Sequence, residues 1–91
     1  MISRKVIFEG RVQGVGFRYT TKEIATGFDV CGWVKNLPDG TVELQVQGED
    51  EEVEDYLKEI LEESPVAHHI KHHTVSEIPP LENPRGFQIR S

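Results

Sequence analysis

Apolar and polar residues alternate in several short segments of the chain, whereas two longer segments repeat apolar residues every three or four positions. The alternating segments, each of which indicates a strand, are residues 5–12, 29–36, 41–47 and 67–75, with a short last strand at Phe87 and Ile89. Helical stripes run from Phe17 to Phe28 and from Val53 to Leu61. No low-complexity tract, internal repeat or linker interrupts these elements, so we expect residues 1–91 to form a single domain.

The residues between these elements indicate how each element ends. Gly27 is placed to end the first helix in a left-handed cap. Leu37 to Gly40 reads Leu-Pro-Asp-Gly, which is typical of a tight turn. Glu49 to Glu52 put four acids where the positive end of the second helix favours them, and Pro65 ends that helix. The order strand-helix-strand-strand-helix-strand, followed by a short final strand, predicts an α+β fold of the ferredoxin-like split βαβ type, with two helices on one face of a mostly antiparallel sheet.

Composition and charge narrow the class of protein. The apolar share is 36 %, and no apolar run approaches the length of a membrane span or a secretory leader, so we expect a cytoplasmic protein without a membrane partner. Cys31 is the only cysteine, which fits a reducing compartment, and we interpret it as a small buried hydrophobe rather than a nucleophile. The net charge of −6 disfavours nucleic acid as a partner. A small anionic substrate must therefore be captured by local positive potential.

The segment Gly10 to Arg18, which reads Gly-Arg-Val-Gln-Gly-Val-Gly-Phe-Arg, lies where a strand ends and a helix begins. Gly14 and Gly16 allow positive φ, so that successive N–H groups and the helix start can face one anion. Arg18 adds a planar group with two parallel donors. Alone, such a segment is also typical of an ordinary turn with a solvated arginine, and its spacing does not match the nucleotide-binding motifs. If it is a site, a small phosphate is the ligand that it favours.

A second motif, Gly-Trp-Val-Lys-Asn-Leu-Pro-Asp-Gly-Thr-Val-Glu, follows from Gly32 to Glu43. Together the two motifs closely resemble the acylphosphatase family. The resemblance runs from Val6 through Gly48, resumes weakly across the second helix and returns at residues 86–90. Leu44 departs from the family pattern, which often has Gly or Ala there. The resemblance implies the ferredoxin-like fold and the metal-free hydrolysis of small acyl phosphates.

The resemblance also implies roles for individual residues, because Gly-Phe-Arg and Trp-Val-Lys-Asn match the family's functional positions. Arg18 would bind phosphate, and Asn36 would position the attacking water. The phosphate-binding residues would be Gln13, Gly14, Val15, Gly16, Phe17 and Arg18. The sequence alone would not select Asn36, since Asn often bonds the backbone of a nearby turn. We expect no cofactor, a small acyl phosphate as the partner, and a monomer.

Four histidines, His68, His69, His72 and His73, offer a different chemistry. On a helix their spacing would suit zinc, but on the expected strand the pairs lie far apart. We therefore favour a solvated edge strand over a metal site.

Two other functions are compatible with parts of the sequence. Gly14 to Tyr19 faintly resembles the aromatic signature of RNA-recognition modules, although the acidic charge and the position of the motif at a loop argue against a non-enzymatic RNA-binding module. The other alternative is an acylphosphatase-like carbamoyl-phosphate module that acts in hydrogenase maturation. Enzymes of that kind carry further domains, which we do not expect in this chain of 91 residues.

Overall fold

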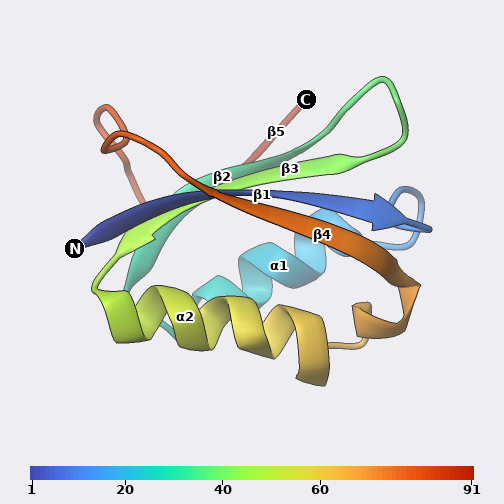
Figure 1. The fold of residues 1–91 in the computed structure, drawn as a ribbon, viewed down its shortest axis with the longest axis horizontal. Coiled ribbons are helices and arrows are strands. Elements are labelled where there is room, and N and C mark those ends of the chain that lie inside the picture. The colour runs from blue at the N-terminus through green and yellow to red at the C-terminus, as the bar shows by residue number, and fades with distance from the viewer.

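A five-stranded sheet forms one layer of the fold, and two helices form the other (Figure 1). The computed structural model describes residues 1–91. The main elements in chain order are β1 (Ile2–Gly10), α1 (Phe17–Ala25), β2 (Val30–Asn36), β3 (Val42–Gly48), α2 (Asp50–Lys58), β4 (Ile70–Glu77) and β5 (Phe87–Arg90). A π-helical turn, η1 (Glu59–Glu63), continues α2, and a 3-10 turn, η2 (Ala67–His69), precedes β4. The predicted α+β ferredoxin-like fold is confirmed.

The strand order β4-β1-β3-β2-β5 determines which chain segments meet at each end of the sheet. All neighbouring strands are antiparallel except β2 and β5, which run parallel. Strand β3 lies between β1 and β2, and its first residue, Val42, pairs with Phe8 on one side and with Asn36 on the other. Strands β1 and β2 therefore finish at the same end of the sheet, with β3 between them.

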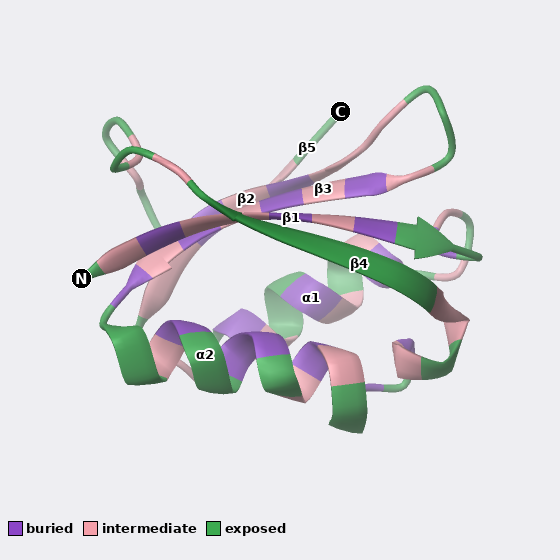
Figure 2. Cartoon of the chain, viewed as in Figure 1, coloured by how far each residue is buried: buried purple, intermediate pink, exposed green.

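The core lies between the sheet and the two helices (Figure 2). Because side chains alternate across a strand, every second residue of the central strands faces the helices. The strands contribute the fully buried Val6, Phe8, Val34, Val42, Leu44 and Val46. The helices contribute the stripes that the sequence predicts, with Phe17, Thr21, Ala25, Val53, Tyr56, Leu57 and Ile60 buried. Leu44, the departure from the family pattern, is thus a core residue.

Tyr56 joins the two helices inside this core. Its hydroxyl donates to the backbone carbonyl of Thr21 on α1 at 2.8 Å, and both residues are fully buried. Its ring packs against Phe28 and Phe87, with ring centroids 5.9 and 5.7 Å apart. Burial raises the pKa of Tyr56, so the hydroxyl stays protonated and remains a donor. The contact holds α1 in a fixed position on the sheet.

Two strands have different bounds from those that the alternation predicts. Strand β1 is Ile2–Gly10 rather than 5–12, and Val12 is buried from the following loop. Strand β4 is Ile70–Glu77 rather than 67–75, because residues 64–69 form tight turns before the chain reaches the sheet. These turns are closed by hydrogen bonds from the Ala67 N–H to the Ser64 carbonyl and from the His69 N–H to the Val66 carbonyl.

The left-handed cap predicted at Gly27 is wrong. Gly27 does not have a positive φ, and α1 ends instead at Thr26 in a right-handed conformation. The N–H groups of Thr26, Gly27 and Phe28 bond to carbonyls three residues earlier. These bonds satisfy the last carbonyls of the helix, so no left-handed residue is needed.

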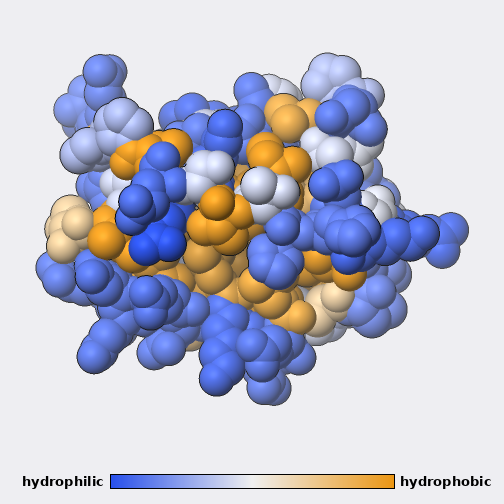
Figure 3. All heavy atoms as spheres, viewed as in Figure 1, coloured by the Kyte–Doolittle hydropathy of each residue, from blue (hydrophilic) through white to orange (hydrophobic).

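The surface is polar around the outside of α2 and apolar in a band beside it (Figure 3). The first turn of α2 carries Asp50, Glu51 and Glu52, as the sequence predicts. Val75 on the edge strand β4 is 41 % exposed. No helix is long and apolar enough to cross a membrane.

We expect Tyr56→Phe to lower the free energy of unfolding by about 1 kcal/mol, because it removes one buried hydrogen bond and leaves the ring packing intact. Urea denaturation measures this change. Tyr19→Phe is the matched control, since Tyr19 is 74 % exposed and its hydroxyl makes no hydrogen bond, and its effect should stay within about 0.5 kcal/mol. Equal stabilities of the two variants would show that the Tyr56 hydroxyl does not hold the helices together.

Candidate active site

The loop between β1 and α1 has an unusual backbone at two glycines. Gly14 has φ 78°, and Gly16, which caps α1, has φ 77° and ψ 21°. A Cβ built at either position would meet no atom within 4 Å. The left-handed backbone, rather than a lack of space, is therefore what requires glycine there. This confirms the positive φ that the sequence predicts at both positions.

The backbone N–H groups of residues 13–19 donate to no acceptor within the protein. The first hydrogen bond after the loop runs from the Thr20 N–H to the Gly16 carbonyl, at 2.9 Å. The N–H groups in the first turn of a helix point along its axis, and the helix dipole makes that end positive. The first turn of α1 contains no acid that would occupy these donors. The start of α1 thus presents free N–H groups and a positive potential to an anion.

A depression of about 150 Å³ lies at this place. Its lining residues are Val12, Gly14, Gly16, Phe17, Arg18, Tyr19 and Asn36. The depression brings together the two residues singled out as catalytic, Arg18 and Asn36, with no Asp or Glu among the lining residues. Of the other predicted phosphate-binding residues, Gln13 and Val15 do not line it, and Val15 packs against the core.

Arg18 lies in the first turn of α1 and is half-buried. One nitrogen of its guanidinium group, Nη1, donates to the carbonyl of Arg90 at 3.3 Å. No carboxylate forms an ion pair with Arg18. The parallel pairing of β5 with β2 brings Arg90 to this edge of the sheet. One contact therefore orients the guanidinium while its charge and its other donors stay available.

Asn36 is the last residue of β2 and faces the helices, because it lies two positions after the buried Val34. Its side chain makes no hydrogen bond within the protein. The turn that follows is closed by other groups, namely the Leu37 N–H on the Thr41 carbonyl and the Thr41 N–H and hydroxyl on Asp39. These bonds from Thr41 hold the pKa of Asp39 below its usual range. In the alternative role, the side chain of Asn36 would stabilise this turn, but no hydrogen bond supports that role.

Gln13 has a contact that the sequence did not predict. Its side-chain Nε2 donates to the carbonyl of Leu37 at 2.8 Å and to the carbonyl of Thr41 at 2.9 Å. The side chain therefore connects the loop to the turn after Asn36, and only the backbone N–H of Gln13 is free. No short-range signal could have found this contact, because the partners are 24 and 28 residues away.

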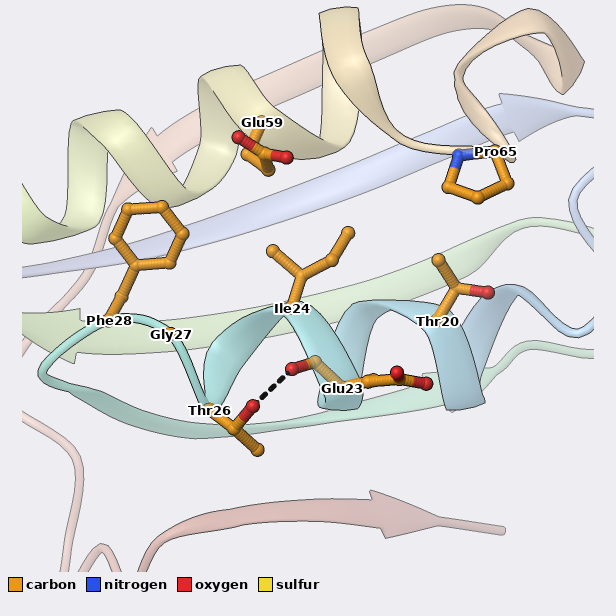
Figure 4. Close-up of a pocket in the computed structure, with 8 residues that line it drawn as sticks. All are labelled: Thr20, Glu23, Ile24, Thr26, Gly27, Phe28, Glu59 and Pro65. Atoms are coloured by element: carbon orange, nitrogen blue, oxygen red, sulfur yellow. Dashed lines mark hydrogen bonds between the residues drawn. The ribbon is translucent and has the colours of Figure 1, made fainter.

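A larger cavity, of about 520 Å³, lies elsewhere, between α1 and η1 (Figure 4). Glu23 from α1 and Glu59 from η1 contribute carboxylates to it, and no Lys or Arg lines it. Two carboxylates without a cation repel an anionic substrate. The smaller depression beside Arg18 is therefore the better site for a phosphate group.

The four histidines do not form a single cluster. His68 and His69 belong to η2, with ring centroids 4.0 Å apart, whereas His72 and His73 lie in β4. Only the second pair is thus on the predicted edge strand, because β4 begins at Ile70. Desolvation lowers the pKa of His69, and the charges of the neighbouring His68 and Arg11 lower it further. No three His, Cys, Asp or Glu side chains are grouped so that they could hold a metal ion.

Two other expectations concern Cys31, as a buried residue that is no nucleophile, and Phe17, as part of the motif that resembles RNA-recognition modules. Cys31 is half-buried rather than buried, and burial, reinforced by Asp29, raises the pKa of its thiol, which disfavours the nucleophilic thiolate. Phe17 is only 2 % exposed and packs on Phe8 with ring centroids 4.9 Å apart. It cannot stack on a base, as the aromatic residues of RNA-recognition modules do.

Comparisons with known proteins identify the family of this chain. The sequence profile of the acylphosphatase family matches residues 4–89. An acylphosphatase of Bacillus pumilus is 39 % identical over 90 residues, which cover 99 % of each chain. The crystal structure of acylphosphatase from Bacillus subtilis superimposes with a TM-score of 0.89 at 34 % identity, with full coverage of both chains. HypF from T. kodakarensis matches with a TM-score of 0.86 at 33 % identity, over all of this chain and 12 % of HypF.

The profile spans nearly the whole chain, and both the curated relative and the solved structure match from end to end. The matched region includes the glycine-containing loop, Arg18 and Asn36. The chain therefore belongs to the acylphosphatase family of enzymes.

Proposed function

We propose that this acylphosphatase hydrolyses the carboxyl–phosphate bond of small acyl phosphates with the loop of residues 13–18 and Arg18 as the phosphate cradle and Asn36 as the group that positions water. One observation carries these assignments. The free N–H groups at the start of α1, the unpaired guanidinium of Arg18 and the unbonded amide of Asn36 surround the same small depression. No acid lines it, so its potential favours an anion.

The leaving group makes a general acid unnecessary. An acyl phosphate is a mixed anhydride, so its hydrolysis expels a carboxylate whose conjugate acid has a pKa of roughly 4. Such a group leaves as an anion at neutral pH without being protonated. A site that contains no His, Asp or Glu can therefore carry out the reaction.

Stabilisation of charge is the main task that remains. Phosphoryl transfer passes through a loose transition state with negative charge on the equatorial oxygens. Backbone N–H groups and a guanidinium that are already in place stabilise this charge without reorganising. The N–H groups of residues 13–18 would donate to these oxygens, and Arg18 would offer two donors on one side. Gln13 and Val15 would contribute through the backbone only.

Water attacks phosphorus on the side opposite the leaving carboxylate. The side-chain amide of Asn36 can accept from this water and so orient one of its lone pairs toward phosphorus. The P–O bond to the acyl group breaks, and its electron pair leaves with the carboxylate. The proton of the water passes to a phosphoryl oxygen of the substrate, so inorganic phosphate is the second product.

We further propose that the chain acts as a single-domain monomer in the cytoplasm and needs neither a metal nor a nucleic acid. The residues assigned to catalysis all come from one chain and from one edge of its sheet. A lone cysteine and a net charge of −6 support the compartment and the choice of a small substrate.

Arg18→Lys should lower kcat/KM for benzoyl phosphate by about 100-fold, because Lys keeps the charge but loses the planar pair of donors. Release of inorganic phosphate measures the rate. Arg11→Lys is the matched control, since Arg11 is exposed in the same loop and does not line the depression. If both variants keep the wild-type kcat/KM, Arg18 is not the phosphate clamp.

Asn36→Ala should lower kcat by about 100- to 1,000-fold, the effect of deleting one preorganised polar group. Inorganic phosphate should still inhibit competitively with an unchanged constant, because the cradle is intact. Lys35→Ala is the control, since Lys35 is adjacent in sequence but lies over the ring of Trp33, at 5.7 Å from its centroid. A wild-type kcat in the folded Asn36→Ala variant would contradict the water-positioning role.

A further inference from the structure

The side chain of Gln13 is the one direct hydrogen-bonded link between the loop and the turn that follows Asn36. Its Nε2 carries two hydrogens, and both are used, one on the Leu37 carbonyl at 2.8 Å and one on the Thr41 carbonyl at 2.9 Å. Because both donors are engaged within the protein, this amide group cannot donate to a phosphate at the same time. Its role must therefore be different from that of the backbone N–H groups beside it.

The turn that receives these two bonds is rigidly closed. The Leu37 N–H bonds to the Thr41 carbonyl at 2.9 Å, and the Gly40 N–H bonds to the Leu37 carbonyl at 3.1 Å. Asp39 accepts from the N–H and the hydroxyl of Thr41 at 3.0 and 2.6 Å. Gln13 thus connects the loop to the hydrogen-bonded turn of residues 37–41, which directly follows Asn36.

Apart from the packing of Val12 and Val15 against the core, the loop has few other constraints. Its glycines contact nothing at the Cβ position, and its N–H groups from residue 13 to residue 19 have no partner in the protein. The two halves of the site, the cradle and Asn36, lie after the end of β1 and at the end of β2, which are not neighbours in the sheet. Their ends are separated by β3, or about 10 Å at the usual strand spacing. Pairing with β3 fixes the ends of the two strands, and Gln13 extends this connection beyond the sheet, from the loop to the turn.

We propose that Gln13 is a positioning residue, which holds the phosphate cradle at a fixed distance from Asn36 so that the water lies in line with the phosphorus–leaving-group bond. The proposal rests on the proposed function, in which Asn36 positions water. Gln13 touches neither substrate nor water through its side chain. Its effect on the rate passes entirely through the geometry between loop and turn.

The test is a double-mutant cycle with Gln13→Met and Asn36→Ala, measured with benzoyl phosphate. Met fills a similar volume but donates no hydrogen bond. Gln13→Met should lower kcat by about tenfold, because a misplacement well below 1 Å already slows a reaction that depends on alignment. The inhibition constant of inorganic phosphate should change by less than about twofold, because this ion needs only the cradle.

The cycle separates positioning from simple destabilisation. In the Asn36→Ala background, Gln13→Met should lower kcat by less than about twofold, since the group that it positions is already absent. Gln47→Met is the matched control. Gln47 also makes two long-range hydrogen bonds, from the Ser3 hydroxyl and the Leu81 N–H, both at 2.7 Å, but far from the depression. It should lose stability and keep the wild-type kcat.

Gln13→Asn tests the same link if the Met variant folds poorly, because it keeps the amide but is one methylene too short to reach both carbonyls. It should show the same fall in kcat. A wild-type kcat in either folded variant, or independent effects of Gln13→Met and Asn36→Ala, would overturn the positioning role. If Asn36→Ala alone leaves kcat unchanged, the proposed function fails instead, so the two failures are distinguishable.

Discussion

The backbone N–H groups at the start of α1 bind nothing within the protein, and a binding site made of such groups depends on the segments that hold them in place. These groups form no hydrogen bond that would fix the loop, so its conformation depends on the packing of side chains around it. Gly14 and Gly16 make the left-handed conformation possible, but glycine does not enforce it. The conformation must therefore be maintained by contacts on both sides of the loop.

Those contacts come from three directions. Phe17 is buried against Phe8 and anchors the start of α1 to the sheet. Tyr56 holds the middle of α1 through its bond to the Thr21 carbonyl. Gln13 ties the loop to the turn after β2. The core thus supports the site, and the N–H groups of residues 13–19 are left without partners where an anion would bind.

The main helices and strands and the positive φ of the loop glycines were predictable from the sequence because they depend on local signals. Alternation and helical periodicity predicted the five strands and the two α-helices, and the family resemblance assigned Gly14, Gly16 and Arg18 to a phosphate site. The two errors in element bounds arose where short-range turns replaced the expected local structure. Hydrogen bonds across residues 64–69 delay the start of β4, and bonds to carbonyls three residues earlier end α1 without a left-handed Gly27. Gln13 was assigned to the phosphate group, since its partners, far away in sequence, leave no local pattern.

Titration of the ¹⁵N-labelled protein with inorganic phosphate, followed by amide chemical shifts, tests most directly whether the start of α1 is the phosphate cradle. We expect the largest shifts at the backbone amides of residues 14–18, together with the side-chain amide of Asn36, which lines the same depression. The side-chain amide of Gln47, which is bonded elsewhere, should not move. Shifts concentrated around the α1–η1 cavity at Glu23 and Glu59, or at the histidines, with residues 14–18 unchanged, would contradict this assignment.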